Sequence, residues 1–112
     1  MASQVEYAVH VVGPPLAGSE LVNGNVDVEV HFVDGRRFGA TFFTVDNLRH
    51  LFDKNRRTGE CAGGLYLWAV AMIVAEDLSA ETMARTVADL LERDEFEAAF
   101  VELPPLPGEG GP

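Results

Sequence analysis

The sequence predicts one small α+β domain, with a mostly antiparallel sheet of four to five strands and two helices packed on one face. Three observations predict this class. Apolar and polar residues alternate on both sides of a turn signal, which is typical of a β-hairpin. Two later segments carry apolar residues at helical spacing. The chain has 112 residues, of which 47% are hydrophobic, so it has the length and the apolar content for one core.

The strands are expected in the first part of the chain. Residues 5–12 are rich in β-branched side chains and predict a strand, which a Gly-Pro-Pro sequence then stops. Every second residue of 26–32 is apolar, so this segment predicts a half-buried strand. Asp34 and Gly35 are typical of a two-residue hairpin turn, and residues 36–43 predict the returning strand.

The two helices are expected behind polar capping residues. Thr44 predicts the N-cap of a helix that ends near Arg57, before Gly59. Ser79 predicts the N-cap of a second helix over residues 80–93. The apolar stripe is Val45, Leu48, Leu51 and Phe52 in the first helix and Met83, Val87, Leu90 and Leu91 in the second. We expect both stripes to face the sheet.

Two segments leave alternatives open. Residues 65–75 are eleven apolar residues without a turn signal. A short buried helix is one reading, but two preceding glycines and many aromatic and branched residues favour strand, either one long bent strand or two broken near residues 69–71. A membrane span needs roughly 20 residues, so we expect no membrane contact. Residues 95–103 suit either a helical turn or a final strand.

The domain is expected to cover residues 1–103. Residues 104–112 contain four prolines and three glycines, which predicts a disordered tail. The single cysteine excludes an intramolecular disulfide bond. The first residues lack a basic region followed by an apolar stretch, so we expect no signal peptide and a cytoplasmic location.

Charge is distributed unevenly along the chain. The net charge is −10, yet residues 36–57 contain six basic and two acidic side chains. Most of the surface should repel a polyanion, which disfavours nucleic acid as a partner. The exception is a basic patch of Arg49, Arg56 and Arg57, which could bind an anion such as nucleic acid. The alternative for this patch is a solvated helix face that acidic residues of the same helix neutralise.

Motifs for chemistry are scarce, and the sequence does not indicate an enzyme. No metal-ligand spacing, phosphate-binding loop or nucleophile elbow is present, so we expect no cofactor and no metal site. The weak catalytic candidate is Cys61, whose thiol could be activated by a histidine. The alternative is a small apolar residue in a tight turn.

An apolar surplus in the predicted sheet is the strongest functional signal. Two helices cover one face, but residues 65–75 are apolar on both faces. We therefore expect a binding surface containing Tyr66, Trp68 and Phe43, unless another segment covers it. The resulting hypothesis is a small acidic, non-enzymatic protein-interaction module, either a homodimer or an inhibitor- or immunity-like partner of a basic protein. The alternative is a small enzyme or ligand-binding domain centred on Cys61 and a histidine.

Overall fold

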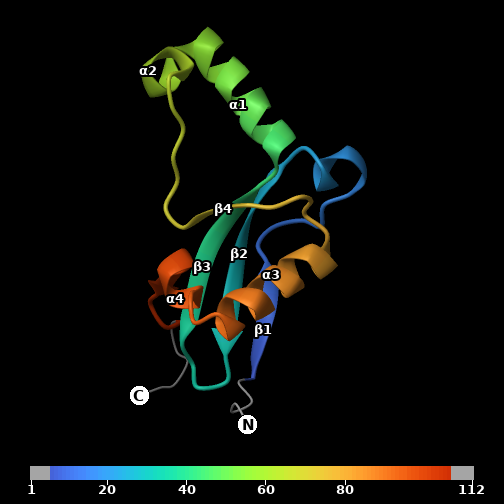
Figure 1. Ribbon diagram of the computed structural model, residues 1–112, viewed down its shortest axis with the longest axis vertical. Coiled ribbons are helices and arrows are strands. Elements are labelled where there is room, and N and C mark those ends of the chain that lie inside the picture. The colour runs from blue at the N-terminus through green and yellow to red at the C-terminus, as the bar shows by residue number, and fades with distance from the viewer. Residues whose placement is uncertain (1–5, 107–112) are drawn as a thin grey trace.

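The computed structural model describes residues 6–106, and these residues form an α+β fold with one open, five-stranded sheet, which confirms the predicted class (Figure 1). The strands are β1 (Tyr7–Val11), β2 (Asn25–Phe32), β3 (Arg37–Phe43), β4 (Met72–Val74) and β5 (Val101–Leu103). β1 pairs with β2 and β2 with β3, both antiparallel. The outer edge of β3 is shared, because β4 runs parallel to one end of it and β5 antiparallel to the other.

The helices all fall between these strands along the chain. They are a short 3₁₀ helix, η1 (Gly18–Leu21), and four further helices, α1 (Val45–Thr58), α2 (Glu60–Gly64), α3 (Ala80–Glu92) and α4 (Phe96–Ala99). The predicted caps are confirmed. Thr44 accepts a hydrogen bond from the Asn47 amide, Ser79 accepts one from the Thr82 amide, and Gly59 ends α1 at φ 88°. The segment 95–103, for which the sequence left helix and strand open, contains both in succession.

The hydrophobic core lies on one face of the sheet. The alternation predicted for β2 is confirmed, because Val26, Val28 and Val30 are buried and pair with even-numbered residues of β3. α3 contributes Met83 and Val87 to this core, and α4 contributes Phe96. Aromatic rings pack α4 against the sheet, with 5.2 Å between the ring centroids of Phe96 on α4 and Phe38 on β3. Two helices therefore pack on one face, and they are α3 and α4.

Helix α1 is not part of this core, which corrects the expected role of its apolar stripe. None of its described residues belongs to the core cluster, and Val45 is half exposed. Figure 1 shows α1 projecting from the end of β3, beyond the sheet. The reason is the short connection: Thr44 alone separates the two elements, so the chain has no loop in which to turn back across the sheet. The Cα radius of gyration is 15.8 Å, larger than the roughly 13 Å of a compact domain of about this length.

The strand expected over residues 65–75 was predicted too long. Only Met72–Val74 enters the sheet, and no residue from 65 to 71 is helical or extended in a ladder. β5 pairs with Arg37–Gly39, which leaves only Thr41–Phe43 on that edge of β3. Ala71 has a left-handed φ of 51°, which turns the chain away from the ladder before β4. We call residues 65–71 the strap, and α1, α2 and the strap together the arm.

The hairpin turn is one residue longer than predicted. The Phe32 amide donates to the Arg36 carbonyl, so residues 33–35 form a three-residue loop. Of these three residues, Gly35 alone has a positive φ, at 99°. A two-residue type I′ turn needs positive φ at both central positions, and Asp34 does not adopt it. The hairpin itself is confirmed.

The predicted tail is only partly covered by the structure. Residues 107–112 lie outside the described residues. Pro104 is held to the sheet, because Nη1 of Arg37 donates to its carbonyl oxygen. Leu103, the last residue of β5, packs over Gly39, and a Cβ at Gly39 would lie 3.1 Å from Cδ1 of Leu103. The first residue of the predicted tail therefore contacts the sheet, and the disordered tail stays a prediction.

Candidate functional site

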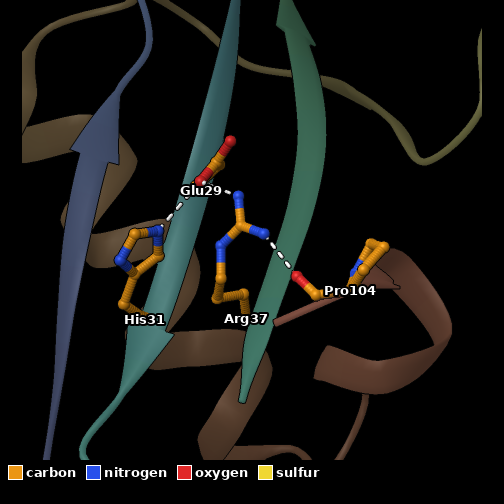
Figure 2. Close-up of polar contacts among 4 residues, drawn as sticks. All are labelled: Glu29, His31, Arg37 and Pro104. Carbon is orange, nitrogen blue, oxygen red and sulfur yellow. Dashed lines mark hydrogen bonds and ion pairs between the residues drawn. The ribbon is translucent and has the colours of Figure 1, made fainter. Parts of the chain in front are cut away.

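The second face of the sheet, which we call the open face, carries a polar network at its centre (Figure 2). Oε1 of Glu29 on β2 accepts hydrogen bonds from Nη2 of Arg37 on β3 and from Nε2 of His31, each at 2.8 Å. Arg37 also holds Pro104, so the network ties β2, β3 and the segment after β5 together. The ring centroids of His10 on β1 and His31 on β2 are 4.3 Å apart.

These side chains meet because of strand register. Glu29 and His31 are two residues apart on one strand and therefore share a face. Arg37 is directly opposite His31 across the β2–β3 pair. Strand periodicity alone puts Glu29 and His31 side by side, but the position of Arg37 depends on the hairpin loop. A two-residue turn and a three-residue loop place different residues opposite each other.

The network lowers the pKa of Glu29 below its usual 4.5. The largest cause is the hydrogen bond from His31, followed by the bond from Arg37. A carboxyl with a lowered pKa contributes stability that is complete above the usual value and is lost as the pH falls through the lowered one. Arg37 is largely buried, and its Nε has no hydrogen-bond partner in the described part of the chain, which opposes part of this stabilisation.

A small hollow lies beside the network. Its volume is about 200 Å³, its apolar walls are Val70, Val101 and Leu103, and Gly39 lies among its lining residues. Asp27 and Glu29 supply carboxylates at its polar side. Pockets for whole small molecules usually measure roughly 300–1,000 Å³. The size of this hollow therefore suits a side chain of a partner better than a complete small-molecule substrate.

The strap carries the apolar surface next to this hollow. Its exposed fractions are 79% for Leu65, 48% for Tyr66, 68% for Trp68 and 59% for Val70. Val70 belongs both to the strap and to the wall of the hollow. The exposure predicted for Tyr66 and Trp68 is therefore observed, although on the strap and not on a strand of the sheet. Phe43 is only 6% exposed and contributes no surface there, and it is flanked on both sides, by Asn25 of β2 and Val74 of β4.

The predicted basic patch lies on the arm. Arg49 is 3.9 Å from Asp46, and Arg56 forms an ion pair with Asp53, both at i,i+3 spacing on α1. Arg57 has no ion-pair partner in the described part of the chain. Acidic residues of the same helix therefore pair with two of the three arginines of this patch, which favours a solvated helix face over a nucleic-acid site.

Cys61 lies in α2, at the far end of the arm. Cys61, Ala62 and Gly63 have φ between 52° and 72°, so this turn is left-handed. Gly64 is required here, because a Cβ would lie 2.9 Å from the Phe52 carbonyl oxygen of α1. No hydrogen bond joins Cys61 to a histidine within residues 6–106. The thiol therefore remains a sequence prediction without a partner group.

Metal binding and membrane insertion are two further possibilities for the described residues. No group of three or more His, Cys, Asp or Glu among residues 6–106 could hold a metal ion. No helix in that part of the chain is long and apolar enough to cross a membrane. The described residues thus form an α+β protein with an arm that carries an exposed apolar strap and with one sheet face that no helix covers. Comparisons with models of known families, with curated proteins and with solved structures find no match.

Proposed function

We propose that this chain is a non-enzymatic protein-interaction module that docks a partner protein on the strap and the adjoining hollow. The observation that carries the proposal is the exposure of four large apolar side chains within six residues, from Leu65 to Val70. Soluble proteins rarely expose apolar residues in such a cluster unless they bind something. Tyrosine and tryptophan are the residues that most often anchor protein interfaces, and Tyr66 and Trp68 are both present.

The hollow provides a second anchor point for the partner. An apolar side chain that enters it would contact Val70, Val101 and Leu103, and the carboxylates of Asp27 and Glu29 lie at its side. Glu29 is already engaged by Arg37, whereas Asp27 accepts one hydrogen bond from the Thr41 hydroxyl and keeps acceptor capacity. A partner segment with an apolar residue beside a cationic one matches this arrangement.

The charge of the molecule supports a basic partner. The net charge is −10, and a surface hollow of about 820 Å³ along α3 includes Glu76, Asp77, Glu81, Asp89 and Glu92 among its lining residues. A field of one sign accelerates encounter with a protein of opposite charge and makes the association sensitive to salt. A homodimer through the strap, the other form of this hypothesis, would bring two acidic bodies together and is less favoured.

The alternative of a small enzyme centred on Cys61 has less support. Of the three histidines, His10 and His31 lie on β1 and β2, at a distance from the arm tip in Figure 1, and only His50 lies on the arm. A thiol that reacts with iodoacetamide near neutral pH much faster than free cysteine would favour this alternative.

A pull-down from the native host with matched variants tests the proposal. The wild type should capture a basic protein at low ionic strength and release it at high ionic strength. The double variant Tyr66→Ala, Trp68→Ala should lose that protein. The control Val33→Ala removes an apolar residue that is 77% exposed on the hairpin loop, and it should bind like the wild type.

Trp68 is the single tryptophan of the chain and reports on the same surface. Its emission in the free protein should be red-shifted and accessible to acrylamide, and the captured partner should shift it to the blue. Capture that is unaffected by the double variant, or a Trp68 that is already shielded from acrylamide in the free monomer, would contradict the proposal.

A further inference from the structure

Within residues 6–106, strand β1 forms an edge of the sheet whose outward backbone groups pair with no other strand. The Val33 amide donates to the Glu6 carbonyl at 3.0 Å, and the Val12 amide donates to the Asp27 carbonyl at 2.9 Å. The direction of hydrogen bonding alternates along an antiparallel strand, so the even-numbered residues of β1 bond to β2. The N–H and C=O groups of Tyr7, Val9 and Val11 therefore point away from the sheet.

This edge lacks the features that usually prevent pairing with another chain. Such edges are commonly blocked by charged side chains, prolines, bulges or a covering segment. Residues 7–12 contain no Asp, Glu, Lys, Arg or Pro, and β1 pairs with β2 without a bulge. Two of its residues, Val11 and Val12, are apolar and exposed by 37% and 47%.

We propose that two copies of this chain associate by pairing β1 with β1, antiparallel about a twofold axis at Val9, so that the two sheets become one. In this register Val9 faces Val9 of the second copy, and Tyr7 faces Val11 of the second copy. These are the residues with outward backbone groups, so each pair can exchange hydrogen bonds in both directions. The twofold axis makes the contact closed, which limits assembly to a dimer.

Charge and side-chain packing favour a second copy as the occupant. Two molecules of net charge −10 repel each other, but this edge is free of acidic residues. The nearest carboxylate, Glu6, would face Val12 of the second copy, so no like charges stand opposite each other. Tyr7 and Val9 pack against the core on the helix-bearing face. Together with Val11 they would form an apolar row across the axis, and this row would bury the exposed Val11.

This interface is separate from the strap, so the two proposals can fail independently. In analytical ultracentrifugation from micromolar to millimolar concentration, the wild type should reach twice the monomer mass of 12.1 kDa. Val9→Pro should remain monomeric over the same range. The Val9 N–H is not used within the sheet, and proline is tolerated on an edge strand with its nitrogen facing solvent. The variant should therefore keep the native circular dichroism spectrum.

A second variant covers the case in which Val9→Pro does not fold. Val11→Lys places a charge on an exposed side chain of the edge and should also abolish the dimer, whereas the control Val33→Lys adds the same charge on the hairpin loop and should not. Amide hydrogen exchange should show protection of Tyr7, Val9 and Val11 that rises with protein concentration, while Ala8 and His10 stay protected throughout. A wild type that is monomeric at every concentration overturns the proposal. So does a dimer that survives Val11→Lys, or one that Trp68→Ala dissociates.

Discussion

Two phenylalanine truncations, one in the core of the sheet and one on α1, test whether α1 packs into the core. Phe42 is fully buried on β3, pairs with Val26 and lies beside Phe100, with 6.3 Å between the ring centroids. Phe52 is partly buried on α1, outside the core cluster. Phe42→Ala removes a whole buried ring and leaves a cavity, which costs about 3–5 kcal/mol. Phe52→Ala opens onto solvent, so we expect a loss of about 1 kcal/mol, from partial burial alone.

The magnitude is large compared with the total stability. A domain of this size has an unfolding free energy of roughly 5–15 kcal/mol, so Phe42→Ala removes a large share. At about 4 °C for each kcal/mol, the melting temperature should fall by roughly 12–20 °C for Phe42→Ala and by about 4 °C for Phe52→Ala. Urea unfolding followed by circular dichroism gives both free energies. If Phe52→Ala lowers the unfolding free energy as much as Phe42→Ala does, then α1 packs into the core. The conclusion that the arm projects away from the core would then be wrong.

Three further predictions concern the open face and the helix cap. Glu29→Gln should lower the unfolding free energy by about 1–2 kcal/mol near neutral pH. This difference from the wild type should shrink as the pH falls below the usual glutamate value of 4.5, because the wild-type carboxyl then takes up a proton. Gly39→Val should displace Leu103 and cost about 1–3 kcal/mol in a thermal melt, because the added Cβ lies 3.1 Å from Cδ1 of Leu103. Thr44→Ala should cost about 1–3 kcal/mol in the same assay, since its buried hydroxyl accepts hydrogen bonds from the amides of Asn47 and Gly24.

Each of these predictions has a contradicting result. A stability difference for Glu29→Gln that stays constant from neutral to acidic pH would mean that the carboxylate charge contributes nothing. Wild-type stability of Gly39→Val would mean that β5 does not lie over that glycine. For Thr44→Ala the matched comparison is Ser79→Ala, whose hydroxyl accepts one backbone amide bond, from Thr82, and which should therefore cost less.

Part of the candidate surface could be predicted from the chain alone. An excess of apolar residues over what two helices can cover indicated that Tyr66 and Trp68 would be exposed. The place of that exposure could not be predicted, because it depends on which segment occupies the outer edge of β3. β5 takes the positions next to Arg37, and this excludes the strap from the ladder. The competition is between segments more than 25 residues apart, and local pattern contains no information about it.

The polar network on the open face could not be predicted from the sequence either. Glu29 and His31 share a face because of the twofold periodicity of a strand, and this needs no partner strand. Arg37 joins them only because the hairpin has a three-residue loop. With a two-residue turn the register would move by one position, and Arg37 would no longer lie opposite His31.

The sequence by itself determined the features that depend on neighbours within a few residues. These are the alternation of β2, the hairpin, and the beginnings and ends of α1 and α3, where Thr44, Ser79 and Gly59 satisfy backbone groups locally. The tertiary structure decided which helices cover the sheet. The stripes of α1 and α3 are alike in periodicity, but α1 follows β3 after a single residue, whereas five residues separate β4 from α3 and allow that helix to turn back over the core. A helix can bury its apolar stripe only if the connecting chain lets it lie on an apolar surface. The folded arrangement of the strands decides whether such a surface is close enough.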